Sequence, residues 1–151
     1  MVGLGYVLNG EDAQRAIDAG AKFISSPFTS SEITSLAKNC GALVMQGVAT
    51  PTEAWEAQQL GADIARVFPA ELLGGPVFVK LLRNTFPHLK MVAHGNVTLD
   101  NILDYVKTGA TAVAIWGTLI EKSWVRYHDW EAIAERAKHF VEKIESLKVI
   151  R

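Results

Sequence analysis

The stretch that decides the fold is QLGADIARV, residues 59–67, in which a Gly-Ala pair leads from a polar segment into a short apolar run. Three more stretches have the same form: DAGAKFISS (18–26), KNCGALVMQ (38–46) and KTGATAVAI (107–115). Apolar runs that alternate with helical segments of about ten residues are typical of βαβ units. The repeat therefore predicts an α/β protein with a parallel sheet.

The alternation continues along the whole chain, with no linker between the units. Strands are expected at residues 6–8, 22–25, 42–45, 63–68, 90–93 and 111–115. Helices are expected at residues 10–19, 30–39, 51–60, 76–85 and 99–108, followed by a C-terminal amphipathic helix at about 128–147. The apolar face of that last helix carries Ile133, Ala137, Phe140, Val141, Ile144 and Leu147.

Regular units of this kind favour a (β/α) TIM-type barrel over a doubly wound sheet, because no G-x-G-x-x-G turn follows a strand. We expect one domain, residues 1–151, that forms a partial barrel. About six of the eight βα units of a closed barrel are present, so the chain is expected to be two units short.

Composition excludes several classes of protein. The chain is 49% hydrophobic and 21% charged, with a formal net charge of -1 and no basic stripe, so a nucleic-acid partner is not expected. No apolar run approaches the roughly 18 residues that span a bilayer, and no signal peptide is visible. A single cysteine, Cys40, excludes an intrachain disulfide and is expected to be buried at a helix end. We expect a soluble protein in a reducing compartment, the cytoplasm or an organellar stroma or matrix.

Arg66 is the unusual residue of its strand, since it lies in the middle of GADIARVFPAELLGG, residues 61–75. Because it is two residues after Ile64, it should point into the barrel. Burying a guanidinium is costly unless it is paired or reaches water. One interpretation is a group that binds a carboxylate or phosphate at the mouth. The other is a structural arginine that pairs with Glu53 or extends to water.

The sequence resembles the KDPG/KHG aldolases, the class I, Schiff-base aldolases of 2-keto-3-deoxy-6-phosphogluconate and 4-hydroxy-2-oxoglutarate. GVATPTE at residues 47–53 and FPAELLGG at residues 68–75 carry the resemblance, and the match extends over essentially the whole chain as units three to eight of the family. The resemblance implies an eight-stranded barrel, commonly a trimer, with the active site at the C-terminal mouth.

The resemblance also places the family's imine-forming lysine at position 66, where this chain has arginine. Imine formation needs a neutral amine, which a guanidinium does not provide. Lys22 and Lys90 are expected at strand starts, on the opposite side of the barrel. Only Lys122, just after the last strand, is considered as a substitute.

The family's phosphate-binding turns correspond to His94-Gly95-Asn96 and Trp116-Gly117 in this sequence. Asparagine tolerates the left-handed backbone that such a turn uses, whereas an indole at 116 is expected to occupy the space of an anion. His94 is either an acid–base group or a hydrogen-bonded loop histidine.

Other residues have two interpretations each. Glu53 and Glu71 either contact a ligand or favour the dipole of a helix start. The aromatic segment WVRYHDW, residues 124–130, is either a partner surface or the packing of the last helix. No metal-ligand spacing is present, and neither a metal nor a cofactor is expected.

The leading hypothesis is an aldolase-family barrel that has lost Schiff-base catalysis and acts in binding, structure or assembly. It is expected to form a homo-oligomer or to bind a partner chain that covers the missing units. The alternative is a lyase with residual aldol cleavage of a 2-keto acid to pyruvate or glyoxylate products. A third hypothesis is a sensor of a keto acid or another small anion.

Overall fold

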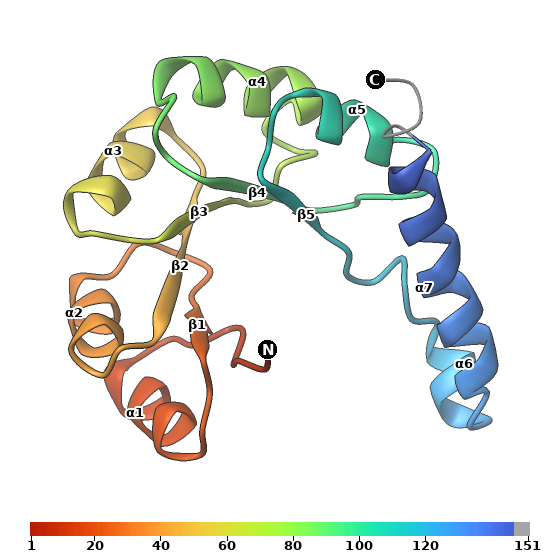
Figure 1. Ribbon diagram of the computed structural model, residues 1–151, viewed down its shortest axis with the longest axis horizontal. Coiled ribbons are helices and arrows are strands. Elements are labelled where there is room, and N and C mark those ends of the chain that lie inside the picture. Colours follow the sequence, from red (N-terminus) through yellow and green to blue (C-terminus); the bar gives the residue numbers. More distant parts are fainter. Residues whose placement is uncertain (147–151) are drawn as a thin grey trace.

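The computed structural model describes residues 1–146, and their strands form one parallel sheet in the order β1-β2-β3-β4-β5. The strands are β1 (Phe23–Ser25), β2 (Leu43–Val48), β3 (Ile64–Val67), β4 (Met91–His94) and β5 (Ala112–Ala114). The sheet curls, so that it has a convex and a concave side (Figure 1). The architecture of the described residues is a five-stranded, curled half-barrel.

Helices cover the convex side of the sheet, one before the first strand and one in each connection between successive strands (Figure 1). These are α1 (Gly10–Asp18), α2 (Ser31–Asn39), α3 (Pro51–Gln59), α4 (Gly75–Thr85) and α5 (Ile102–Lys107). After β5 the chain forms α6 (Lys122–Arg126) and α7 (Trp130–Glu145), on the far side of the open concave space from α1. No described helix is both long and apolar enough to cross a bilayer.

The helices begin where the sequence provides capping residues. The side chains of Asn9, Ser30 and Thr50 accept hydrogen bonds from the backbone of Asp12, Ile33 and Glu53, respectively. Such caps satisfy backbone N–H groups that have no partner inside the helix. Local chemistry therefore fixes where α1, α2 and α3 start, whereas α4, α5 and α6 have no side-chain cap hydrogen bond.

The expected strand at residues 6–8 is wrong. Leu4 makes an isolated parallel bridge with Ile24, and the N–H of Val7 donates to the carbonyl of Ser25 at 3.1 Å. Between them, Tyr6 has a φ of 60°, which no extended strand contains. The N-terminal segment thus follows β1 without becoming a sixth strand.

Two clusters of buried apolar side chains lie between the sheet and its helices. The larger contains Val67, Met91 and Ala93 from the central strands, and the smaller contains Ile24 and Val44. Side chains of a strand alternate between its two faces. Residues next to these core positions are therefore directed to the concave side.

Two expectations about burial are corrected. Cys40 caps the C-terminal end of α2 and is exposed rather than buried. On α7, Phe140 packs against the larger cluster and is 5% exposed, whereas Val141 is 54% exposed and does not belong to the buried face. Leu147 lies outside the described residues.

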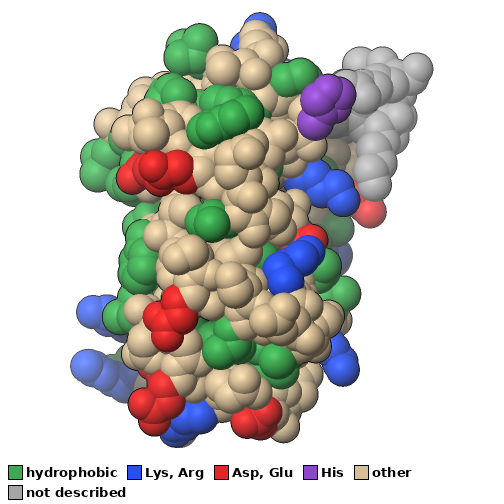
Figure 2. Space-filling view, turned by 90° about the vertical axis from the view of Figure 1, so that its left-hand side faces the viewer, with side chains coloured by type: hydrophobic (Ala, Val, Ile, Leu, Met, Phe, Trp, Pro, Cys, Tyr) green, Lys and Arg blue, Asp and Glu red, His purple; other side chains and the backbone are tan. Residues whose placement is uncertain are grey.

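On the outer face of α1–α3, hydrophobic side chains are scattered among charged ones (Figure 2).

Candidate functional site

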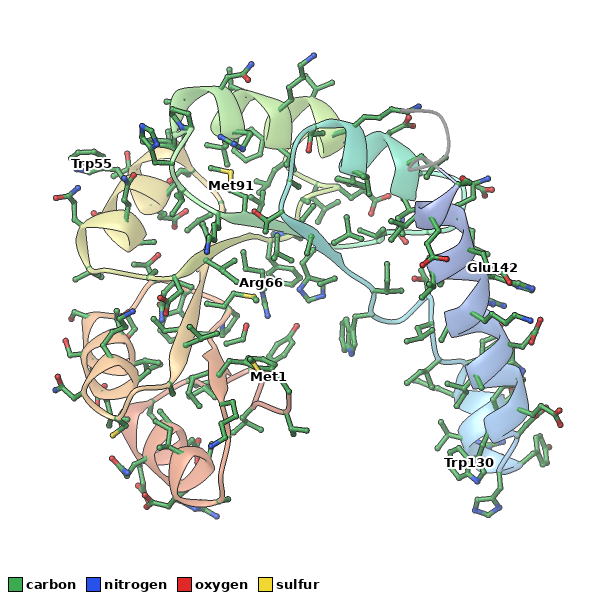
Figure 3. All side chains as sticks on the ribbon, in the orientation of Figure 1. Met1, Trp55, Arg66, Met91, Trp130 and Glu142 are labelled. Atoms are coloured by element: carbon green, nitrogen blue, oxygen red, sulfur yellow. The ribbon has the colours of Figure 1, made fainter. Side chains whose placement is uncertain are left out.

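Arg66 lies on β3 and points into the concave side of the sheet, as expected (Figure 3). The residue is only 4% exposed. Its Nη1 donates a hydrogen bond to the hydroxyl of Ser25 on β1, at 3.2 Å. Nε and Nη2 are buried and make no hydrogen bond within residues 1–146. The site therefore holds a buried cation with unused donors.

Two aromatic rings enclose the guanidinium. The Cζ atom of Arg66 is 4.8 Å from the centre of the Phe68 ring and 5.6 Å from that of Tyr6. Both distances lie within the range of a cation–π interaction. Burial lowers the pKa of Arg66, and the Tyr6 side chain acts in the opposite direction. A guanidinium with a lowered pKa is still protonated near neutral pH, so the site keeps its positive charge.

His94 is the last residue of β4 and is 6% exposed. Its ring is 5.0 Å from the ring of Phe68 and 6.3 Å, edge-on, from that of Trp116. Neither ring nitrogen makes a hydrogen bond among the described residues, so the interpretation as a hydrogen-bonded loop histidine is wrong. Burial, and next the charge of Arg66, lowers the pKa of His94 to about 4. The imidazole is therefore neutral at pH 7.

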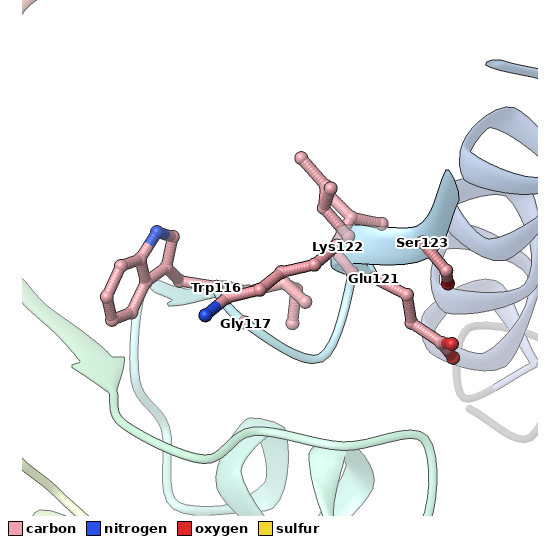
Figure 4. A pocket seen from close by; sticks show the side chains of 8 residues that line it. Trp116, Gly117, Glu121, Lys122 and Ser123 are labelled. Atoms are coloured by element: carbon pink, nitrogen blue, oxygen red, sulfur yellow. The ribbon is translucent and has the colours of Figure 1, made fainter. Parts of the chain in front are cut away.

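Trp116 follows β5 and is 66% exposed, at the edge of the same site. Its ring centre is 5.9 Å from that of Tyr6, which belongs to the N-terminal segment. Beside it lies an open hollow of about 740 Å³ that Gly117, Glu121 and Lys122 also line (Figure 4). The side chain of Lys122 extends toward Trp116 in this view.

The turn after β4 packs closely against the turn after β3. Gly95 has a φ of 125°, and a Cβ there would lie 3.0 Å from the backbone nitrogen of Ala70. Asn96 has a φ of 44°, and its amide donates to Glu71 at 2.6 Å. Glu71 lies in the turn before α4, so the expected role in the first turn of a helix is wrong.

Glu53 does not pair with Arg66, which corrects that expectation. Its carboxylate accepts hydrogen bonds from the backbone of Ala49 at 2.7 Å and from the hydroxyl of Thr50 at 3.0 Å. The backbone of Glu53 in turn donates to Thr50, a reciprocal arrangement like a capping box. Glu53 lies in the first turn of α3, where a negative charge is favourable.

The site thus brings together Arg66, His94 and Trp116, and separates them from Glu53. Sequence reasoning missed Ser25 and Phe68 as neighbours of the guanidinium. The spacing of Phe68, two residues after Arg66, could have indicated that it shares the concave face. No sequence signal indicated Ser25, because strand β2 separates β1 from β3.

The described chain places neither a lysine amine nor a group of metal-binding side chains at the site. No lysine lies on a strand of the described sheet, so none is positioned as Arg66 is. Within residues 1–146, no three His, Cys, Asp or Glu side chains are grouped as a metal site would require.

The family is shown by direct comparison. The model of the KDPG and KHG aldolase family matches residues 1–136. The 2-dehydro-3-deoxy-phosphogluconate aldolase of Treponema pallidum is 34% identical over 106 residues, which cover 70% of this chain and 50% of that protein. The chain belongs to the KDPG and KHG aldolase family.

Solved structures agree with this assignment. A native KDPGal structure has a TM-score of 0.82 at 26% identity, and the match covers 95% of this chain and 69% of that one. A second match is a chain of a porous protein cage that was designed by fusing symmetric oligomeric domains. Its TM-score is 0.84 at 26% identity, and the match covers 97% of this chain and 54% of the cage chain. The present chain spans half the length of the Treponema relative.

Proposed function

We propose that this chain is a member of the aldolase family that binds a small anion, such as a 2-keto acid, at Arg66 without forming an imine. The observation that carries the proposal is a buried guanidinium whose Nε and Nη2 have no partner among the described residues. Unmatched buried donors cost about 1–3 kcal/mol each, which an anionic ligand offsets by accepting from them.

The loss of imine chemistry is supported by the chemistry at position 66. By resemblance, this position carries the reactive lysine of the family, and a guanidinium does not form a Schiff base. No lysine lies elsewhere on the described strands. The fold and core are retained, while the group that performs the reaction is replaced.

Ligand entry requires movement of an aromatic ring. Tyr6 and Trp116 are 49% and 66% exposed. The Tyr6 ring lies beside the guanidinium of Arg66, and the Trp116 ring lies beside the ring of His94. Neither exposed ring is held by a strand, because Tyr6 precedes β1 and Trp116 follows β5. We therefore expect a change in tryptophan fluorescence when the site is filled.

Ligand-dependent thermal stability tests the proposal. Pyruvate or sulfate should raise the Tm of the native chain, because a ligand that binds only the folded state stabilises it. The Arg66→Met variant should lose this response. The matched control is Arg15→Met, which removes an exposed arginine of α1 and should keep the response. An Arg66→Met protein that responds as strongly as the native chain would overturn the proposal.

The second function is residual lyase activity, which the named activities of the relatives favour. Incubation with pyruvate and borohydride, followed by intact-mass measurement, tests it directly. A reduced adduct on any lysine, Lys122 included, would favour the lyase. An unchanged mass would favour anion binding without covalent chemistry.

We also propose that the half-barrel belongs to an eight-stranded barrel and that the protein is a homo-oligomer, a trimer by family resemblance. The outer edge of β5 pairs with no described strand, and the designed cage related to this chain was built from symmetric oligomeric domains. Unpaired edges are normally covered in native proteins. Light scattering should give a mass that is a multiple of the chain mass, and a stable monomer would contradict the oligomer.

A further inference from the structure

Arg66, which is cationic, and His94, which becomes cationic when protonated, are buried on neighbouring strands. Both side chains lie against the ring of Phe68. We propose that binding of a doubly charged anion at Arg66 is coupled to the uptake of one proton by His94. The site then binds a dianion as a guanidinium–imidazolium pair. This inference rests on the proposed anion-binding function and assigns the charge of the ligand that the site prefers.

The site contains buried polar atoms that make no hydrogen bond within the described residues. Nε and Nη2 of Arg66 and both ring nitrogens of His94 are buried without a hydrogen-bond partner in residues 1–146. A neutral imidazole offers one donor and one acceptor, whereas an imidazolium offers two donors. Protonation of His94 therefore converts the site into one that only donates, which suits an oxyanion with several acceptor oxygens.

The site carries a positive charge that the described protein does not balance. No carboxylate in the described chain pairs with Arg66 or His94, so the positive charge of the guanidinium is not neutralised by the protein. In the empty site, burial and the charge of Arg66 keep the pKa of His94 at about 4. A monoanion is balanced by Arg66 alone. A dianion leaves one negative charge that favours the imidazolium.

The elements around the histidine ring supply few other ionisable groups. Arg66 faces it from β3, and Tyr6 of the N-terminal segment lies against Arg66. Beyond β5, Lys122 extends toward Trp116, and Glu71 is engaged by Asn96 in the turn after β4. The carboxylates of Glu71 and Glu53 already accept hydrogen bonds from Asn96 and from the backbone of Ala49.

The coupling fixes the sign of the pH dependence. Above the pKa of about 4 the empty protein has neutral His94, so binding takes up a proton until the pH exceeds the higher pKa of the complex. In that window the affinity for a dianion should fall by up to about tenfold for each unit of increasing pH. At higher pH the affinity should be constant, because binding then uses Arg66 alone.

Calorimetric titration with sulfate tests the inference, because sulfate stays a dianion from pH 5 to pH 8. At constant ionic strength, sulfate should bind the native chain at least about tenfold more tightly at pH 5 than at pH 8. Formate, a monoanion over this range, should show a much smaller change. Titration in two buffers with different ionisation enthalpies should show an uptake approaching one proton per sulfate at pH 5.

His94→Gln is the matching variant, because an amide has a donor and an acceptor but does not titrate. It should bind sulfate with one weak affinity at all pH values, while His88→Gln, at an exposed position, should behave as the native chain. A pH-independent sulfate affinity or zero proton uptake in the native chain would overturn the coupling and leave the anion site intact. Sulfate and pyruvate both failing to bind at any pH would instead overturn the proposed function.

Discussion

The hydroxyl of Ser25 on β1 accepts a hydrogen bond from Nη1 of Arg66 on β3, at 3.2 Å, so a single contact joins two strands that are separated by β2. The sheet curls, and Arg66 lies on its concave side (Figures 1 and 3). It is the one hydrogen bond that the Arg66 side chain makes within residues 1–146. Because a guanidinium has five N–H donors, this contact leaves most of its bonding capacity unused.

The Ser25–Arg66 contact predicts a coupling that a double-mutant cycle measures. Ser25→Ala should lower the free energy of unfolding by about 1.5–2 kcal/mol, because it leaves the third nitrogen of the guanidinium without an acceptor as well. In an Arg66→Met background the same change should cost less than about 0.5 kcal/mol. Urea unfolding of the four proteins gives the coupling energy. Equal costs in both backgrounds would mean that the hydrogen bond contributes nothing.

Arg66→Lys should restore imine formation, because it replaces the buried guanidinium with an amine. Burial among aromatic rings lowers the pKa of a lysine and provides a neutral amine. Pyruvate with borohydride should then add one reduced pyruvate to the variant, mapped by peptide mass to residue 66. The native chain and Arg66→Met should show no adduct. An unmodified Arg66→Lys protein would show that the identity of residue 66 is not what prevents the chemistry.

Much of the fold could be predicted from local sequence. The Gly-Ala pairs, caps and apolar runs located the five strands of the sheet and every described helix except the short α6, since glycine closure and N-capping act within a few residues. The strand expected at residues 6–8 failed because Tyr6 adopts a positive φ, which a tyrosine gives no reason to expect. Its neighbours nevertheless bond to β1, as Val7 does to Ser25.

The site could be predicted less completely. The inward direction of Arg66 followed from strand alternation. Its expected partner Glu53 was wrong, because a backbone donor four residues away and a hydroxyl donor three residues away engage that carboxylate. The contacts of Arg66 with Ser25 and Tyr6 depend on the curvature of the sheet and the path of the N-terminal segment, which no local pattern encodes.

Glu53 should act on stability and not on ligand binding. Glu53→Ala removes the acceptor for two donors at the start of α3 and should cost about 1 kcal/mol, as the loss of a helix cap does. Chemical unfolding measures this cost, and the Tm shift with pyruvate should be unchanged. Glu56→Ala, an exposed change on the same helix, is the control and should be nearly neutral. A lost Tm shift in Glu53→Ala would place its carboxylate at the ligand instead.

The turn after β4 should tolerate substitution less well than the turn after β5. Gly95→Ala combines a positive φ with a Cβ only 3.0 Å from the backbone of Ala70, and should cost about 2–3 kcal/mol. Gly117→Ala has a φ of 76° but meets nothing within 4 Å, so it should cost about 1 kcal/mol. Thermal unfolding of the two variants in parallel gives the order. A smaller loss for Gly95→Ala would contradict the close approach of Gly95 to Ala70 in the turn after β3.

His94 should make the ligand-free protein less stable in mild acid. Its pKa is about 4 in the folded chain and about 6.5 when unfolded, so the unfolded state binds more protons between these values. The stabilisation is therefore complete above pH 6.5 and is lost as the pH falls toward 4. It amounts to about 2–3 kcal/mol between pH 7 and pH 4.5. Urea unfolding across this range should show the loss in the native chain and in His88→Gln. In His94→Gln, the free energy of unfolding should fall less steeply as the pH decreases. The same pH dependence in His94→Gln and the native chain would mean that His94 is already protonated or solvated in the folded protein.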